Sequence, residues 1–222
     1  MFIEDHLEFW LKIARTRLRA NMPQYLLMGD SNLFWLDQKC HEEPWKNIQS
    51  EETTATFLCR LLDIPPMQYP IVKGIYLDWT NIMRLKSLIT AMEDCAGSKH
   101  DIHLVLWIGQ NAAYDVAQHY NTRDALRAQV HQQVDSFVSK LTDIYAFSRI
   151  YFIGYHDHSE MAEDDRYMAA CEYLIGRMLS KLPQAVFIPM METKDDMYQD
   201  KKHLKMEFQF EVAKHIFSFI EQ

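Results

Sequence analysis

The fold is decided by residues 25–32, which read YLLMGDSN. A short apolar run stops at Gly29 and is followed by the polar residues Asp, Ser and Asn. Such a run is typical of a buried parallel strand, and the polar residues behind it favour a tight turn. We therefore expect a strand, a turn and a helix start at the beginning of the core.

The same alternation repeats along the chain. Short apolar runs recur at 71–72, 102–108, 150–153 and 185–188. Segments with helical periodicity lie at 79–95, 123–141, 162–181 and 206–220. Five strands alternating with helices predict an α/β fold, a three-layer αβα sandwich around a five-stranded parallel sheet. Residues 37–69 show no clear strand pattern, and we expect them to lie over the surface as helix and loop.

Composition limits the classes of function. The 222 residues include 23 Lys and Arg against 31 Asp and Glu, a formal net charge of −8. This balance argues against extensive binding of nucleic acid, because counterion release needs clustered cations.

Hydrophobic residues make up 48% of the chain, and neither a linker nor a repeat divides it, so we expect a single domain over 1–222. The acidic start and the lack of an 18-residue apolar run predict a cytoplasmic protein without a transmembrane segment.

An extra amphipathic helix is predicted over residues 1–20, ahead of the core. Its basic residues at 12–19 form a solvated face or a contact for RNA or an acidic partner, and the same helix is a candidate contact for a homodimer. The cysteines stand singly, which favours free thiols packed as small hydrophobic residues; they are Cys40, Cys59, Cys95 and Cys171.

Polar residues and glycine follow the predicted strands. Ser31, Gly74 and Asn111 come after the first, second and third strands, and Asp200 and His203 precede the last helix. In open parallel sheets the ligand crevice lies at the carboxyl ends of the strands. A serine attacks a carbonyl when an imidazole takes its proton and a carboxylate orients the imidazole. Backbone N–H groups and an asparagine amide can stabilise the resulting oxyanion, so these residues suit acyl transfer.

These residues resemble the sequence blocks of the SGNH hydrolases, also called the GDSL esterase/lipase superfamily. The blocks are matched by GDS at 29–31, Gly74, GQN at 109–111 and DKKH at 200–203. The resemblance covers nearly the whole chain, from about residue 24 to the end. It implies a flavodoxin-like sheet with strand order 2-1-3-4-5.

The resemblance also implies roles. Ser31 would be the nucleophile, His203 the base and Asp200 its partner, while Ser31, Gly74 and Asn111 would form the oxyanion hole. The implied activity is that of a serine hydrolase that cleaves carboxylic esters through an acyl-enzyme intermediate, without a cofactor or metal. The implied substrates are small-molecule, lipid or sugar esters.

Alternatives stay open for each block. Asp30 or Ser31 could cap a helix, Asn111 could cap the following one, and His203 could be a surface residue that opens the last helix. The alternative function is an SGNH-like scaffold that binds RNA or protein with little or no catalysis.

Weaker candidates surround this constellation. Asn32, His156 and His158 are candidate substrate contacts at the crevice. The His-x-His pair could also hold a metal, but no third ligand is located in the sequence, and we predict no metal site. The tryptophans at 35, 45 and 79 are interpreted as core residues rather than as a pocket lining.

Glycine is scarce, with six residues where average usage gives about fifteen. Gly29, Gly74 and Gly109 fall in the matched blocks, and Gly154 ends the fourth predicted strand. We expect these four on one edge of the sheet, where the backbone turns or approaches a ligand. Gly176 is predicted to be a packing contact within a helix.

Overall fold

The computed structural model describes residues 24–30, 33, 53–63, 71–73, 77, 82–83, 85–87, 89–90, 93, 101–155, 164–198 and 204–221. The elements along the chain are β1 (Gln24–Gly29), α4 (Thr54–Leu61), β2 (Ile71–Lys73), β3 (Ile102–Trp107), α6 (Gln110–His119), α7 (Arg123–Ile144), β4 (Arg149–Ile153), α9 (Asp165–Lys181), β5 (Ala185–Ile188), the 3-10 helix η3 (Asp195–Met197) and α10 (Met206–Ile220). The helix predicted over 1–20 lies outside the described residues.

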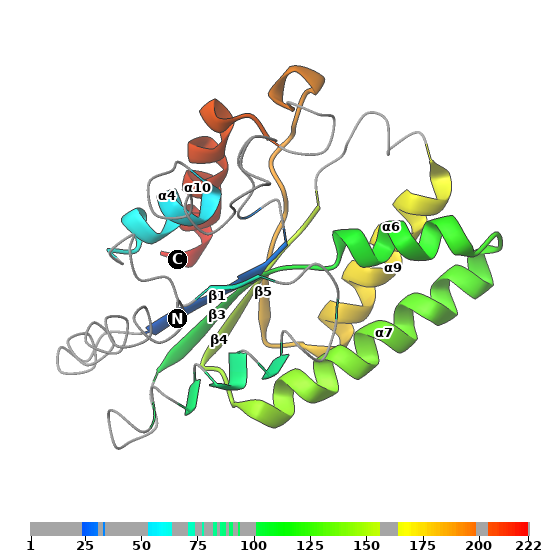
Figure 1. The fold of residues 1–222 in the computed structure, drawn as a ribbon, viewed down its shortest axis with the longest axis horizontal. Helices are drawn as coiled ribbons and strands as arrows, with labels where there is room; N and C mark the ends of the chain where they lie inside the picture. Colours follow the sequence, from blue (N-terminus) through cyan, green and yellow to red (C-terminus); the bar gives the residue numbers. More distant parts are fainter. Residues whose placement is uncertain are drawn as a thin grey trace, which may run out of the picture.

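The strands form one parallel sheet in the order β2-β1-β3-β4-β5. Helices cover both of its faces (Figure 1): α4 and α10 lie on one side, and α6, α7 and α9 lie on the other. The prediction of an α/β fold built on a parallel sheet is confirmed.

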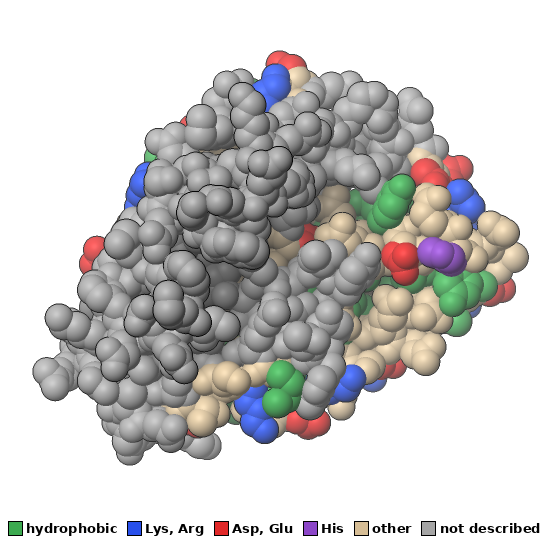
Figure 2. All heavy atoms as spheres, viewed as in Figure 1, with side chains coloured by type: hydrophobic (Ala, Val, Ile, Leu, Met, Phe, Trp, Pro, Cys, Tyr) green, Lys and Arg blue, Asp and Glu red, His purple; other side chains and the backbone are tan. Residues whose placement is uncertain are grey.

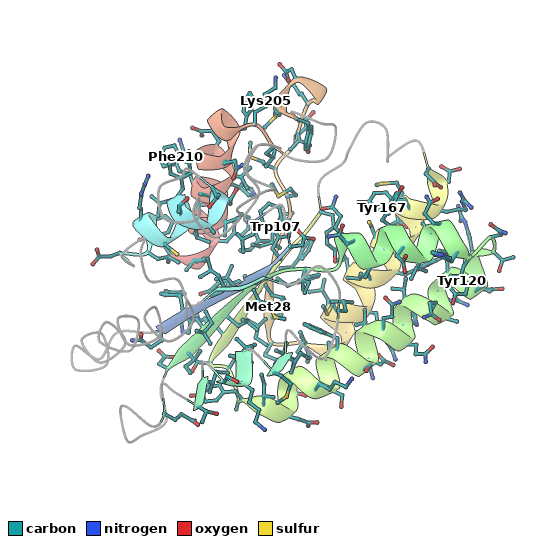
Figure 3. The ribbon with its side chains drawn as sticks, in the orientation of Figure 1. Met28, Trp107, Tyr120, Tyr167, Lys205 and Phe210 are labelled. Carbon is teal, nitrogen blue, oxygen red and sulfur yellow. The ribbon has the colours of Figure 1, made fainter. Side chains whose placement is uncertain are left out.

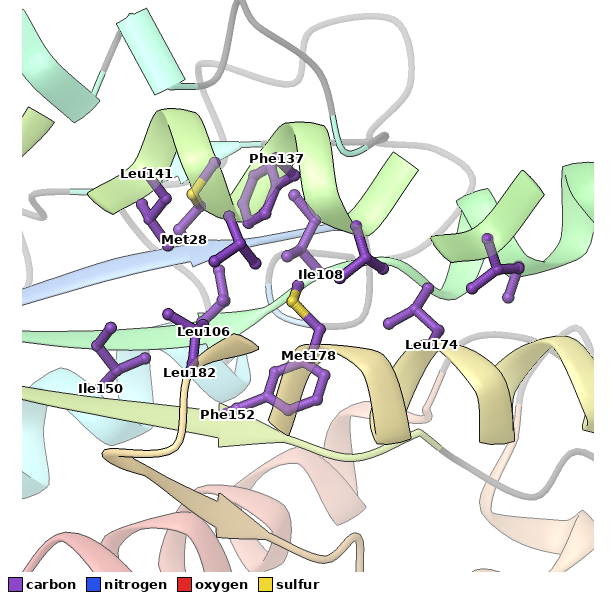
Figure 4. Packing of buried hydrophobic residues seen from close by; sticks show 14 of the residues in the cluster. Met28, Leu106, Ile108, Phe137, Leu141, Ile150, Phe152, Leu174, Met178 and Leu182 are labelled. Carbon is purple, nitrogen blue, oxygen red and sulfur yellow. The ribbon is translucent and has the colours of Figure 1, made fainter. Parts of the chain in front are cut away.

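The strands are apolar because both faces of the sheet are buried. Successive strand side chains point to opposite faces. Leu26 and Met28 of β1 therefore pack under α7 and α9, whereas Leu27 packs under α4 and α10. Figure 4 shows Met28 between the sheet and the helix that carries Phe137. A strand covered on both sides has no polar face, which explains the uninterrupted apolar runs in the sequence.

The helices α7 and α9 begin at side-chain caps. Thr122 accepts a hydrogen bond from the Ala125 N–H at 3.3 Å and starts α7. Asp164 accepts one from the Arg166 N–H at 2.9 Å and starts α9. These polar side chains satisfy N–H groups that have no partner within the helix. The helices predicted over 123–141, 162–181 and 206–220 correspond to α7, α9 and α10.

The expected surface position of residues 37–69 is wrong for α4. This helix is buried along one side and packs against α10; its buried residues are Thr54, Ala55, Thr56, Leu58 and Cys59. Thr53 forms a capping box, since its Oγ1 accepts from the Thr56 N–H at 3.1 Å and its own N–H donates to Thr56 Oγ1 at 2.6 Å. Together with α10, this helix covers the second face of the sheet, and that position buries its apolar side.

Three smaller predictions can be compared with the structure. Cys59 and Cys171 are buried free thiols, as expected, and the other two cysteines and the three tryptophans lie outside the described residues. The interpretation of Gly176 as a packing contact is wrong, because a Cβ built there meets no atom within 4 Å. None of the helices in the described ranges has the length and hydropathy that a bilayer span requires.

Candidate active site

The carboxyl ends of β1, β3 and β4 meet at one edge of the sheet. Gly29 pairs in register with Trp107, and the Asp30 N–H extends the ladder by donating to the Trp107 carbonyl at 3.1 Å. The Gly154 N–H donates to the Ile188 carbonyl of β5 at 2.8 Å. Figure 3 shows Trp107 on the α4 and α10 side of the sheet and Tyr167 on the α6 and α9 side. The described residues that follow these strands, Asp30, Ile108 and Gly154, thus lie on the same edge of the sheet.

Of the predicted site residues, the structure describes Asn111. The others lie outside the described residues: Ser31, Asn32, Gly74, His156, His158, Asp200 and His203. Several of them are bonded to residues that are described. Ser31 follows Asp30, Gly74 follows Lys73 at the end of β2, and His203 precedes Leu204.

Asp30 and Asn111 come together although 81 positions separate them in the sequence. Asp30 is 2% exposed, and its Oδ2 accepts a hydrogen bond from Asn111 Nδ2 at 3.4 Å. Asn111 lies within the first turn of α6, whose N-cap is Gly109. The capping alternative for Asn111 is therefore wrong, since its amide is directed at a carboxylate from another strand end.

Gly29 and Gly109 allow the backbone to approach neighbouring residues closely at this edge of the sheet. Gly109 has a φ of +117°, which side chains disfavour, and a Cβ there would lie 2.7 Å from Tyr155 Oη. A Cβ on Gly29 would lie 2.7 Å from Leu33 Cδ2 and 2.9 Å from the Trp107 carbonyl oxygen. Both positions therefore exclude a side chain, which agrees with their place in the matched blocks.

Two tyrosines, the half-buried Tyr155 and the buried Tyr167, lie near the start of α6. Tyr155 Oη donates to the Ile108 carbonyl at 3.0 Å. Burial raises the pKa of Tyr155 well above its ordinary value, and nearby Cys171, Asp30 and Tyr167 raise it further. Burial also raises the pKa of Tyr167 far above its ordinary value. Both hydroxyls consequently stay protonated and can act as hydrogen-bond donors.

The described residues on either side of positions 199–203 pair with each other. Tyr198 and Leu204 form an antiparallel bridge, and the Lys205 N–H donates to the Met197 carbonyl at 2.8 Å. Leu204 is buried in the same core cluster as Trp107, so this bridge is attached to the α4 and α10 side of the sheet. Residues 199–203, which connect the two sides of the bridge and include Asp200 and His203, lie outside the described residues.

The sequence assigned no role to Tyr155, and Asp30 entered as a member of the matched block at 29–31 and as a possible helix cap. The signal for Asp30 is a charged residue directly after a fully apolar run, where burial demands a partner. Tyr155 occupies the equivalent position after β4, but nothing in the sequence indicates which carbonyl its hydroxyl reaches. In the ranges that are described, no three His, Cys, Asp or Glu side chains are grouped to hold a metal, and His156 and His158 lie outside them.

Comparison with known proteins gives a likeness among the solved structures. No family model matches the chain, and no curated protein matches its sequence. Among solved structures, the crystal structure of TesA, a GDSL/SGNH thioesterase, matches with a TM-score of 0.54 and 18% sequence identity. The match covers 89% of this chain and 98% of TesA. The chain therefore has an SGNH hydrolase-like fold.

Proposed function

We propose that this protein is a serine hydrolase that cleaves carboxylic esters, thioesters included, through an acyl-enzyme intermediate. The observation that carries the proposal is the contact between Asp30 and Asn111, at 3.4 Å, which joins the first and third blocks at the carboxyl edge of the sheet. The fold shared with TesA adds support, because TesA is a thioesterase.

In the proposed reaction, Ser31 Oγ attacks the substrate carbonyl while His203 takes the hydroxyl proton. Asp200 orients the imidazole and stabilises its protonated form. The proton then passes from His203 to the departing alcohol or thiol, which leaves Ser31 acylated. Water activated by the same histidine hydrolyses the acyl-enzyme and restores the serine.

Asn111 suits the role of oxyanion donor. Its amide nitrogen carries two hydrogens, of which one is directed at Asp30. The second hydrogen can be offered to the oxyanion, and the contact with Asp30 limits rotation of the amide. A donor that is oriented before reaction stabilises the developing charge without reorganisation.

Gly74 is proposed as a further donor through its backbone N–H. It follows Lys73, which pairs in register with Gly29. The proposed Ser31 and Gly74 therefore each follow closely on one of two paired strand ends. This relation supports a shared oxyanion site between the ends of β1 and β2.

The test is a panel of p-nitrophenyl esters from acetate to palmitate, with a thioester of one matching acyl chain. We expect Ser31→Ala to abolish turnover, and we expect a fluorophosphonate probe to label the wild-type protein but not this variant. Ser180→Ala is the matched control, because Ser180 is exposed near the end of α9 and its Oγ donates to the Arg177 carbonyl of the same helix. Wild-type protein that resists the probe and hydrolyses none of these compounds would contradict the proposal.

The binding-module alternative rests on residues 12–19, which lie outside the described residues, as does the helix expected to mediate a homodimer. Figure 2 shows acidic and basic side chains interspersed on the described part of one face, and this distribution gives no support to nucleic-acid binding there. We further propose that residues 1–222 form a single domain, in agreement with the share of the chain that matches TesA.

A further inference from the structure

The turn between β3 and α6 contains the Ile108 carbonyl, which lies beyond the strand pairing of the described residues. The pairing of β1 with β3 ends at Gly29 and Trp107, and the pairing of β3 with β4 ends at Leu106. Ile108, the next residue, is fully buried. A buried backbone carbonyl needs a hydrogen-bond donor, and Tyr155 Oη supplies it at 3.0 Å.

Tyr155 also lies against the next residue of this turn. A Cβ on Gly109 would come within 2.7 Å of Tyr155 Oη and 3.0 Å of Leu174 Cδ1. The tyrosine ring in turn packs edge-on against Phe152 of β4, with ring centroids 6.4 Å apart. Packing against β4 therefore positions the Tyr155 hydroxyl. The hydroxyl in turn contacts the backbone of the turn at Ile108 and Gly109.

The same turn begins the helix that presents Asn111. The Ala113 N–H donates to the Gly109 carbonyl at 2.9 Å, which closes the first turn of α6. Asn111 thus lies between two restraints: its backbone follows a turn held by Tyr155, and its amide contacts Asp30. These restraints come from the ends of β4 and β1, on either side of β3.

We propose that Tyr155 is a positioning residue whose hydroxyl, bonded to the Ile108 carbonyl, holds the turn at Gly109 and so fixes the Asn111 amide as an oxyanion donor. The catalytic part of this inference rests on the proposed function. Tyr155 itself touches neither substrate nor nucleophile in this scheme.

The hydroxyl keeps its proton under ordinary conditions. Its pKa is raised mainly by burial, and the groups that face it, Cys171, Asp30 and Tyr167, act in the same direction. We therefore expect the bond to Ile108 not to change with pH near neutrality.

The experiment compares Tyr155→Phe with Tyr151→Phe. Both changes remove a hydroxyl near a backbone carbonyl, but Tyr151 Oη reaches Ile220, at the end of α10, at 3.4 Å. Complete loss of an oxyanion donor costs on the order of 10²–10³ in kcat, and a misplaced donor should cost less, so we expect Tyr155→Phe to lower kcat about tenfold. We expect KM to stay within about twofold, because the donor acts mainly in the transition state.

Tyr151→Phe should leave both constants near their wild-type values. Equal kcat for Tyr155→Phe and wild type would overturn the catalytic part of the inference. An increase in KM with unchanged kcat would also overturn it, since that result would mean a role in substrate binding.

A second measurement does not depend on activity. We expect amide hydrogen exchange at Ala113 to become about tenfold faster in Tyr155→Phe, because the first turn of α6 loses its support, and to be unchanged in Tyr151→Phe. Unchanged exchange at Ala113 would overturn the inference whatever the kinetics. Faster exchange in a protein without Ser31-dependent turnover would instead overturn the proposed function and leave the structural role of Tyr155 standing.

Discussion

At Gly109 the backbone takes a φ of +117°, and a side chain there would meet the Tyr155 hydroxyl. Two separate costs therefore oppose any other residue: backbone strain and a steric clash. Asp30 is constrained in a different way, because a carboxylate that is 2% exposed needs hydrogen-bond donors. The geometry around Asn111 thus depends on residues that are not themselves predicted to react.

Substitution of Gly109 tests both costs. We expect Gly109→Ala to lower the free energy of unfolding by about 1–3 kcal/mol, measured by urea denaturation. In a Tyr155→Phe background the added Cβ no longer meets an oxygen at 2.7 Å, so the loss should be smaller. Strictly additive losses in the double-mutant cycle would contradict the clash.

At the scale of the elements, capping and helical periodicity account for α7 and α9. Their starts at Thr122 and Asp164 are visible in the sequence as polar residues before periodic apolar positions. The same signal exists for α4, where apolar residues at 55, 58, 59 and 62 follow Thr53. The helix was predictable from that spacing, but its buried position was not, because burial depends on which other element covers the sheet.

Gly176 offers a test within α9. The residue is exposed in the helix interior, and a Cβ there meets no neighbouring atom. We expect Gly176→Ala to raise the free energy of unfolding by about 0.5–1 kcal/mol, because alanine loses less backbone entropy in a helix. Thermal denaturation of the two proteins provides the comparison. A lower melting temperature would show that this position has a packing role after all.

At the scale of the whole molecule, Gln209 joins segments that are far apart in the chain. It is 2% exposed, and its Oε1 accepts from the Thr54 N–H at 2.7 Å across 155 positions. Its Nε2 donates to the Leu204 carbonyl at 3.2 Å. The Gln209 side chain of α10 therefore binds the start of α4 at Thr54 and also binds Leu204, which lies just before α10.

Gln209→Leu should be severely destabilising. It leaves one buried N–H and one buried carbonyl without this partner, at about 1–3 kcal/mol each, so we expect a loss of about 2–6 kcal/mol in urea denaturation. Ile216→Val is the control on the same helix, where Ile216 is fully buried, and should cost about 0.5–1.5 kcal/mol. Equal losses for the two variants would indicate that the hydrogen bonds of Gln209 contribute little.

The candidate site was predictable only in outline. Positions after apolar runs indicate Asn111 and the edge of the sheet on which it lies, because parallel strands all end on the same side. The contact of Asn111 with Asp30 and the bond from Tyr155 to Ile108 were not predictable. Both depend on side-chain directions across neighbouring strands, which no local pattern in the sequence records.

The amino-acid sequence by itself determined the alternation of buried strands and amphipathic helices, since the periods of hydrophobic residues are local properties. It also determined which residues follow each strand, from Asp30 to Tyr155. Only the tertiary structure decided that α4 covers the sheet, that Gly109 must stay without a side chain, and that Asp30 meets Asn111. These features arise from strand register and from close packing between segments that lie up to 155 positions apart in the sequence. The contacts between such segments form only when the chain folds.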